Sequence, residues 1–260
     1  MHKYKIIFFD IDGTLYSHTQ ERIPLSCVNA IKKLKENGYI IALCSGRSLL
    51  LLDQLKIREY IDVDYMVLIN GSLVIDKNLN EIYKCPINTN TMEKFVNKVK
   101  EIQGELAIIT KDDLFRLGDN LELINKGYIP LHIDIPPKKD FINKEVYQCN
   151  LFIEDYQINE FKELENELNF IHLLDYGYDV LAKDESKTKG IEKLINYLKI
   201  DKEECIAFGD GNNDVGMIEY VGLGIAMGNG VSQIKQKADY VTSSIDEDGI
   251  YNALKHFNLI

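Results

Sequence analysis

An apolar run ends abruptly in two carboxylates within the stretch Lys5-Ile6-Ile7-Phe8-Phe9-Asp10-Ile11-Asp12-Gly13-Thr14-Leu15. A parallel strand that is buried on both faces reads as a continuous apolar run. Ligands in open α/β sheets bind just outside the carboxyl ends of such strands. Asp10 and Asp12 are therefore expected where the chemistry lies, and two anions this close need a cation or a substrate proton to offset them. Asp-Gly is also a common turn dipeptide, which would explain Asp12-Gly13 but not Asp10.

The composition predicts a globular protein with one large domain or two smaller ones. The chain has 260 residues, of which 45% are apolar and 27% are charged, and these values are ordinary for globular proteins. The net charge of -11 argues against nucleic acid and anionic membranes as partners, because both attract basic faces. No apolar run approaches the length of a membrane span. We expect the N-terminus to enter a strand directly, which would leave no room for a signal peptide.

The cysteines predict a reducing, cytoplasmic location. They are odd in number and scattered, without the C-x-x-C pairing of a metal site. Most of them lie in apolar surroundings, which is typical of small core residues. The cysteines are Cys27, Cys44, Cys85, Cys149 and Cys205.

Strands and helices alternate at the two ends of the chain. Near the N-terminus we expect strands over 5–10, 39–44 and 65–69, helices over 24–37 and 45–55, and a hairpin over 72–83. Near the C-terminus we expect helices over 187–199 and 232–237 and from about 213 and 247, and strands over 205–208, 222–227 and 240–241. This order implies parallel strands with right-handed crossovers. The fold class is therefore α/β, with a Rossmann-like parallel-sheet core made of residues 1–83 and 185–260.

The middle of the chain, residues 84–184, reads as an inserted α+β module. We expect helices over 89–103 and 159–168, and strands over 105–110, 114–117, 145–153, 170–174 and 179–182. Tyr176-Gly177-Tyr178-Asp179 is interpreted as a turn, which could also reach over a substrate. Insertions are usually tolerated at surface loops, so the core domain would be discontinuous.

Polar residues follow four of the predicted core strands. They are Asp10 and Asp12, then Ser45, then Asn70, then Asp210, Asn213 and Asp214, while Lys187 opens the helix before the last of these strands. Four carboxylates at one edge of a sheet need a hard cation held by oxygen, which indicates Mg²⁺. The chemistry that fits is phosphoryl transfer. Asp10 can serve as a nucleophile that forms an aspartyl-phosphate, and Asp12 can protonate the leaving alcohol and later activate water. Lys187 and Mg²⁺ would supply charge around the phosphoryl oxygens.

These motifs, taken together and in order, resemble those of the haloacid dehalogenase (HAD) superfamily. The motifs are Asp10-Ile11-Asp12-Gly13-Thr14-Leu15, Ser45-Gly46-Arg47, Lys187 and Gly209-Asp210-Gly211-Asn212-Asn213-Asp214. The Asn70-Gly71 element, the run from Lys187 to Ile191 and the insert resemble the Cof-like, type IIB phosphatases. This resemblance implies a HAD fold in which an α/β cap over 84–184 closes over the substrate and sets specificity.

The resemblance also implies a role for each motif residue. Asp10 would be the nucleophile and Asp12 the general acid/base. Asp10, the backbone carbonyl of Asp12 and Asp210 would hold Mg²⁺, with Asp214 holding Lys187 or a metal-bound water. The substrate and its phosphoryl group would be bound by Ser45, Gly46, Arg47, Asn70, Lys187 and Asn213.

Several of these residues have a structural alternative. Ser45 could be an N-cap, and Asn70-Gly71 is a strong turn signal. Arg47 could be a solvated arginine, although its place in a first helical turn opposes the helix dipole. Only the resemblance selects Lys187 over Lys183 and Lys189. The run Gly222-Leu223-Gly224-Ile225-Ala226-Met227-Gly228 lacks the last glycine of a dinucleotide loop and is interpreted as tight packing.

Three functional hypotheses follow. The first is a Mg²⁺-dependent phosphatase that hydrolyses small phosphorylated metabolites, such as sugar phosphates or similar monoesters. A phosphomutase of the same superfamily would give an isomerised sugar phosphate instead of free phosphate. A receiver-like signalling module would be shorter and would not need Asp12. The sequence sets neither the physiological substrate nor the oligomeric state, monomer or dimer.

Overall fold

The computed structural model describes residues 3–129, 134–141, 144–174 and 177–260. The chain forms two compact units. The first contains Met1–Arg47, Leu51–Lys84 and Ser186–Ile260, and the second contains Ser48–Leu50 and Cys85–Glu185. Every helix in the described ranges falls short of the length and apolar character needed to cross a bilayer.

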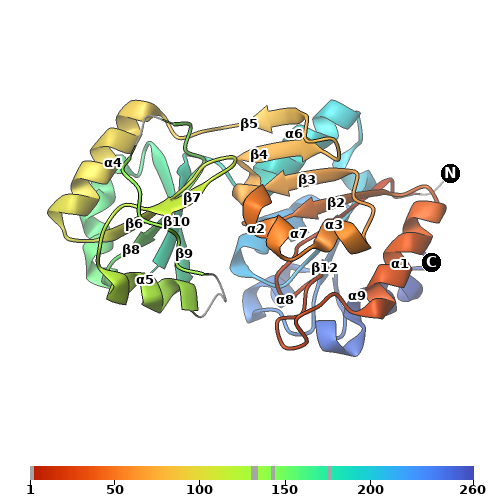
Figure 1. Cartoon of the computed structure of the whole chain (residues 1–260). Coiled ribbons are helices and arrows are strands. Elements are labelled where there is room, and N and C mark those ends of the chain that lie inside the picture. Colours follow the sequence, from red (N-terminus) through yellow and green to blue (C-terminus); the bar gives the residue numbers. More distant parts are fainter. Residues whose placement is uncertain (1–2, 130–133, 142–143, 175–176) are drawn as a thin grey trace. The chain divides into compact units, whose positions relative to one another are not determined.

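The first unit is built on an eight-stranded sheet (Figure 1). Its strands are β1 (Ile6–Phe9), β2 (Ile40–Cys44), β3 (Tyr65–Leu68), β4 (Leu73–Asp76), β5 (Glu81–Lys84), β11 (Cys205–Gly209), β12 (Leu223–Ala226) and β13 (Tyr240–Val241). Their order is β13-β12-β11-β1-β2-β3-β4-β5. The pairs from β13 to β3 are parallel, whereas β4 and β5 pair antiparallel. The first strand, β1, thus lies between β2 and β11, and β11 comes from the C-terminal part of the chain. This order confirms the parallel-sheet core.

Helices cover this sheet. They are α1 (Leu25–Glu36), α2 (Leu49–Gln54), α3 (Ile57–Tyr60), α6 (Lys187–Leu198), α7 (Val215–Tyr220), α8 (Ser232–Lys237) and α9 (Gly249–His256). Short 3-10 turns are η1 (Ile69–Gly71), η4 (Lys202–Glu204), η5 (Asn212–Asp214) and η6 (Ile245–Glu247). Helix α3 was not expected from the sequence.

Strand β1 is the centre of the core. Its four residues are all 0% exposed, because each face of the strand packs against side chains. Ile6 and Phe8 join a cluster with apolar residues of α6, α7 and α8, and alternation along a strand sends Ile7 and Phe9 to the opposite face. There the ring of Phe9 stacks on Phe208 of β11, with 5.1 Å between centroids. The apolar run that precedes Asp10 therefore fixes the start of the site rigidly in the sheet.

The glycine run around β12 is a region of tight packing, as the sequence indicates. A Cβ atom on Gly224 would lie 2.2 Å from the carbonyl oxygen of Ile218, and one on Gly228 would lie 2.6 Å from the amide nitrogen of Ser244. Cys27, Cys44, Cys149 and Cys205 are buried and Cys85 is partly buried, so the expectation that most cysteines are core residues is confirmed.

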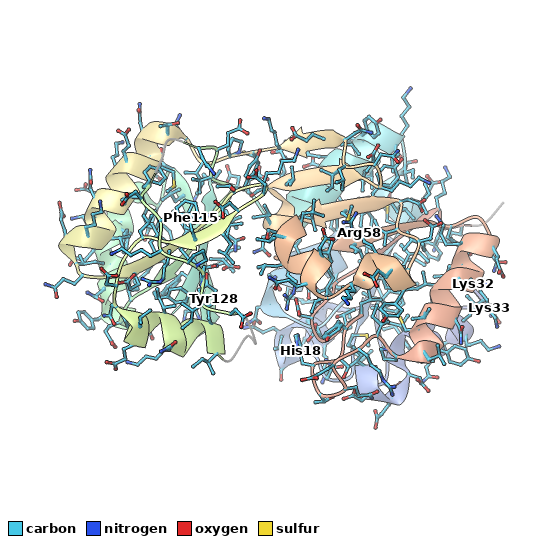
Figure 2. The ribbon with its side chains drawn as sticks, in the orientation of Figure 1. His18, Lys32, Lys33, Arg58, Phe115 and Tyr128 are labelled. Atoms are coloured by element: carbon cyan, nitrogen blue, oxygen red, sulfur yellow. The ribbon has the colours of Figure 1, made fainter. Side chains whose placement is uncertain are left out.

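The second unit is an antiparallel sheet with helices. Its elements are α4 (Thr89–Glu101), β6 (Glu105–Ile109), β7 (Leu114–Arg116), α5 (Leu121–Tyr128), β8 (Gln148–Phe152), the 3-10 helix η3 (Asp155–Leu164), β9 (Leu168–Leu174) and β10 (Gly177–Ala182). The strand order is β7-β6-β8-β10-β9. Apolar residues of α4 and η3 pack on one side of the sheet. Tyr128, at the end of α5, contacts the ring of Phe152 and donates a hydrogen bond to Asn150 (Figure 2).

Two expectations for the second unit were wrong, and one helix was missed. The helix expected over 159–168 is the 3-10 helix η3, which starts at Asp155 because Glu154 and Gln157 form a capping box. The turn expected at Tyr176-Gly177-Tyr178-Asp179 begins outside the described residues, and Gly177 to Asp179 pair with β8 within strand β10. Helix α5 was not expected, although Asn120 accepts the N–H of Leu123 as its N-cap.

Candidate active site

The central strands of the first unit bring separate polar segments to one edge of the sheet. Asp10 follows β1, Ser45 follows β2, Asn70 lies in η1 directly after β3, and Asp210 follows β11. These four strands are neighbours in the order β11-β1-β2-β3 and run parallel. Their carboxyl ends therefore meet, although the residues come from opposite ends of the chain.

Lys187, the first residue of α6, links two of the carboxylates. Its Nζ lies 2.5 Å from Oδ1 of Asp10 and 2.6 Å from Oδ1 of Asp214, and its side chain is 1% exposed. Burial alone would lower the pKa of Lys187, but the charges of Asp10 and Asp214 outweigh it and raise that pKa. The lysine is therefore held as a cation at the centre of the cluster.

Burial raises the pKa of Asp10 well above its usual value, and the charge of Asp214 adds to this effect. Burial, followed by the charge of Asp214, raises the pKa of Asp210 to about 6. The hydroxyl of Thr14 donates to Oδ1 of Asp210 at 3.0 Å. One lysine thus does not offset the carboxylates gathered here, and a further cation would favour their ionised forms.

The residues present fit a divalent metal ion. Asp10, Asp210 and Asp214 each offer one oxygen, and these oxygens lie within 4.8 Å of one another. Both oxygens of Asp214 are engaged, because Oδ1 accepts from Lys187 and Oδ2 accepts the N–H groups of Asp210 and Gly211 at 3.1 and 2.9 Å. Asp214 thus accepts three hydrogen bonds from the described residues, against one for Asp10 and two for Asp210. We therefore expect Asp10 and Asp210 to be better able to coordinate an ion, while Asp214 orders the loop and holds Lys187. Oxygen ligands of this kind suit hard cations such as Mg²⁺.

The carboxylate of Asp12 is held by hydrogen bonds from two neighbouring side chains. Nε of Arg47 donates to its Oδ2 and Nη2 of Arg47 donates to its Oδ1, both at 2.7 Å. Nε2 of His18 also lies 2.7 Å from Oδ1. Burial would raise the pKa of Asp12, but the hydrogen bonds from His18 and Arg47 outweigh it and lower that pKa far below its usual value. Arg47 is therefore not a solvated arginine. Its guanidinium group is already paired with the carboxylate of Asp12.

Asn70 joins the site through strained backbone, and Ser45 through a hydrogen bond within its own loop. Ile69, Asn70 and Gly71 all have positive φ angles of 52°, 48° and 100°, which is costly for the β-branched Ile69. This turn lets Oδ1 of Asn70 accept from Asn213 at 3.0 Å. A Cβ on Gly46 would lie 3.1 Å from the Asn70 amide. The hydroxyl of Ser45 accepts the N–H of Arg47 at 3.1 Å, so it shapes the loop before α2.

Sequence reasoning missed three residues that contact the predicted ones, namely Thr14, His18 and Asn229. It also missed Asp246, which accepts a hydrogen bond from Ser17 in the loop of His18. Thr14 lies inside the first motif and could have been found there. His18 lies beyond that motif, and nothing in the sequence pairs it with Asp12 or pairs Asp246 with the first loop.

Comparison with known proteins places the chain in a family. The model of the haloacid dehalogenase-like hydrolases matches residues 7–254. The chain belongs to the haloacid dehalogenase-like hydrolases. This hydrolase is 34% identical to the Bacillus subtilis protein YkrA, over 98% of both chains. It is 26% identical to the Bacillus subtilis 5-amino-6-(5-phospho-D-ribitylamino)uracil phosphatase YcsE, over 98% of this chain and 96% of the other.

Solved structures give the same assignment. The structure of the HAD subclass IIB sugar phosphatase BT4131 is 32% identical, covers 98% of this chain and 100% of its own, and superposes with a TM-score of 0.85. The fold class, the resemblance to the type IIB phosphatases and the assignment as an enzyme are therefore confirmed. This hydrolase acts on phosphate esters, and its family generally uses a divalent metal ion. These findings favour an enzyme over the receiver-like alternative.

Proposed function

We propose that this hydrolase is a Mg²⁺-dependent phosphatase of small phosphorylated metabolites that works through an aspartyl-phosphate on Asp10. The observation that carries the proposal is the placement of Lys187 between Asp10 and Asp214, beside Asp210. Such a cluster offers a carboxylate nucleophile together with positive charge for phosphoryl oxygens. The bound ion, held by Asp10 and Asp210, would neutralise charge on the phosphoryl group.

The proposed chemistry has two steps. A carboxylate oxygen of Asp10 attacks phosphorus, the bond from phosphorus to the oxygen of the leaving alcohol breaks, and this leaving oxygen takes a proton from Asp12. Water then attacks the same phosphorus and gives a proton to Asp12, and the bond to Asp10 breaks to release phosphate. In the structure Asp12 is held in its ionised form, the form that accepts the proton from water. The negative charge of a phosphate ester bound beside it would raise its pKa and favour the acid form.

The substrate class is supported by the relatives. One is named as a sugar phosphatase and another as a phosphatase of a ribitylaminouracil phosphate, and both names describe small organic monoesters. We propose that Ser45, Gly46, Arg47, Asn70, Lys187 and Asn213 bind the substrate and its phosphoryl group. We also propose that the inserted residues 84–184 form the cap that chooses the leaving group, with the core in 1–83 and 185–260.

A metabolite screen tests the proposal. Purified protein is assayed for phosphate release from a broad panel of phosphate monoesters with Mg²⁺, with EDTA, and as the Asp10→Asn variant. We expect release with Mg²⁺ only, and its loss in the variant. Product analysis by NMR separates free phosphate from the isomerised sugar phosphate that a mutase would give. No release from any ester, or an Asp10→Asn variant as active as the wild type, would overturn the proposal.

A further inference from the structure

The loop after the first motif carries a histidine that the family motifs do not assign. Nε2 of His18 lies 2.7 Å from Oδ1 of Asp12. Since an ionised carboxylate only accepts hydrogen bonds, Nε2 is the donor of this pair. The edge of the His18 ring also contacts Tyr16, with 5.4 Å between ring centroids. Figure 2 labels His18 in the first unit.

The three donors leave the two oxygens of Asp12 unequal. Oδ1 accepts from both His18 and Arg47, whereas Oδ2 accepts a single bond from Arg47 among the described residues. A carboxylate oxygen has two in-plane acceptor sites. Oδ1 is therefore saturated, and Oδ2 keeps one site for a leaving group or a water molecule. Without His18 the two oxygens would differ less, and the carboxylate could rotate around its last bond.

A distant carboxylate holds the loop on both sides of His18. Oδ1 of Asp246 accepts from the Ser17 hydroxyl at 2.6 Å and from Nε2 of Gln20 at 2.9 Å, and Oδ2 accepts from the Thr19 hydroxyl at 2.7 Å. The side chains on either side of His18 in the sequence therefore bind Asp246, and His18 itself binds Asp12. Backbone bonds between Ser17 and Arg22, 2.9 and 3.2 Å long, close the loop at its base.

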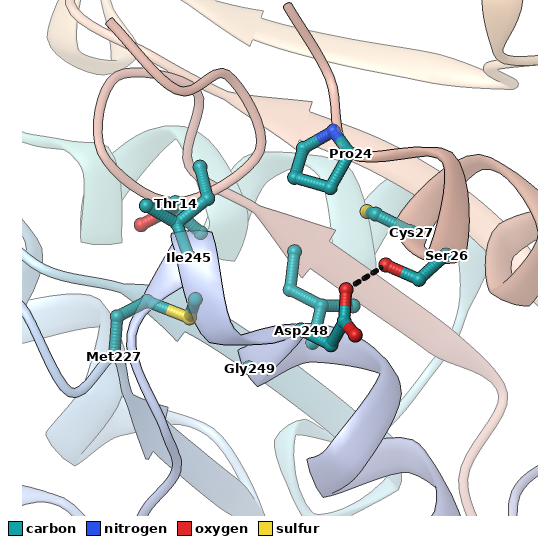
Figure 3. Close-up of a pocket in the computed structure, with 9 residues that line it drawn as sticks. Thr14, Pro24, Ser26, Cys27, Met227, Ile245, Asp248 and Gly249 are labelled. Atoms are coloured by element: carbon teal, nitrogen blue, oxygen red, sulfur yellow. Dashed lines mark hydrogen bonds between the residues drawn. The ribbon is translucent and has the colours of Figure 1, made fainter. Parts of the chain in front are cut away.

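The segment that contains Asp246 is hydrogen-bonded to other loops of the site. Oδ1 of Asn229 accepts the N–H of Ile245 at 2.9 Å, and Nδ2 of Asn229 donates to the carbonyl oxygen of Gly13 at 2.8 Å. Next to this segment, Asp248 accepts from the hydroxyl of Ser26 at 2.5 Å (Figure 3). The small pocket between them has no room for a water molecule. The C-terminal loop is thus a fixed support for the loop of His18.

We infer that His18 is a positioning residue, which together with Arg47 fixes the carboxylate of Asp12 with Oδ2 open to the reacting ester, and that Asp246 holds His18 in place. This inference rests on the proposed role of Asp12 in phosphate-ester hydrolysis. Loss of His18 would then harm the step that protonates the leaving group more than it harms binding of the phosphoryl group or the metal ion.

The test compares two esters of similar shape. p-Nitrophenyl phosphate has a leaving group that departs without a proton, whereas benzyl phosphate releases an alkoxide that needs one. The value of kcat/KM reports the steps up to the first irreversible one, which includes this departure. For His18→Ala we expect a loss of about tenfold or more with benzyl phosphate and little change with p-nitrophenyl phosphate. The Mg²⁺ concentration for half-maximal activity should not change.

Further variants keep the test decisive. His18→Gln, whose amide can donate from nearly the same place as Nε2, should recover most of the benzyl phosphate activity. Asp246→Ala should show the same selective loss and should add little to His18→Ala, because the two residues act in one chain. His256→Ala, on the exposed side of α9, is the matched control. Far-UV circular dichroism and thermal unfolding establish that each variant is folded.

The outcomes separate the inference from the proposed function. If the wild type hydrolyses neither ester with Mg²⁺, the proposed function fails and the inference fails with it. If the wild type is active and His18→Ala loses equal activity on both esters, or none, the inference alone is overturned. A selective loss that His18→Gln does not relieve also overturns it, because the hydrogen bond to Asp12 would then not be the cause.

Discussion

Lys187 and Asp10 form an ion pair in the interior of the first unit, with Nζ 2.5 Å from Oδ1 and with side chains that are only 1% and 7% exposed. The pair joins the start of α6 to the end of β1, which lie far apart in the sequence. Because Asp214 binds the same ammonium group, a single buried cation is shared by two buried carboxyl groups. The stability of the protein and its proposed chemistry therefore depend on the same contact.

Lys187→Met should strongly destabilise the metal-free protein. Removing one partner of a buried pair leaves an uncompensated charge, at a cost of about 3–5 kcal/mol. Urea denaturation in EDTA measures the free energy of unfolding. Lys189→Met is the matched control, because Lys189 lies on the same helix and pairs with the partly exposed Glu192. Equal losses of unfolding free energy in the two variants would show that the buried pair stabilises the protein no more than the surface pair does.

Arg47→Lys should lower kcat/KM by about tenfold. Lysine keeps the charge but cannot donate to both oxygens of Asp12 in parallel, and one charge-assisted hydrogen bond of about 1.5 kcal/mol corresponds to about that factor. Steady-state assays on the best ester of the metabolite screen measure the effect. Arg58→Lys, which changes a surface pair with Asp53, should have wild-type kinetics. An unchanged kcat/KM in Arg47→Lys would mean that the bidentate contact between Arg47 and Asp12 is not needed for turnover.

Asp210→Asn should stabilise the metal-free protein more at pH 8 than at pH 5. The pKa of Asp210 is raised to about 6, above the value of about 3.9 in an unfolded chain. Its protonated form thus adds stability that is present below pH 4 and is lost as the pH rises through 6. Asparagine does not ionise and avoids this loss. Thermal unfolding in EDTA at both pH values, with the exposed variant Asp62→Asn as control, checks the sign.

The same variant should lose its response to Mg²⁺. A ligand that binds the folded state alone raises the melting temperature, and Asp210 is one of the two carboxylates best placed to hold the ion. We expect Mg²⁺ to raise the melting temperature of the wild type at pH 8 and to leave that of Asp210→Asn unchanged. A full shift in the variant would remove Asp210 from the proposed metal site.

Gly13→Ala should weaken Mg²⁺ binding more than the strain of an alanine at a positive φ angle would by itself. Gly13 has a φ of +79°, and a Cβ there would lie 2.4 Å from Oδ2 of Asp210. Gly38 has a φ of +86° with nothing within 4 Å of its Cβ position, so Gly38→Ala carries similar strain, about 1–2 kcal/mol, without the clash. Calorimetric titration with Mg²⁺ should show lower affinity in Gly13→Ala alone. Equal affinities would mean that Asp210 can shift without loss.

The core strands could be predicted from the sequence because each is buried on both faces. The apolar run before Asp10 and the run before Asp210 became β1 and β11, each with every residue buried. In the second unit the signals were weaker. Helix α5 has only eight residues, and the turn expected near Gly177 was overridden by pairing of β10 with β8 on one side and β9 on the other. Such strand pairing depends on tertiary contacts, which local turn preferences do not predict.

The sequence by itself determined that Asp10 and Asp210 would follow buried parallel strands, because strand periodicity and sheet topology dictate where such residues emerge. Only the tertiary structure decided that Arg47 and His18 bind Asp12, and that Asp246 supports the loop of His18 across 228 residues of chain. Hydrogen bonds between side chains depend on distances of a few tenths of an ångström. Those distances are set when separate loops pack together, and no local pattern in the sequence encodes them.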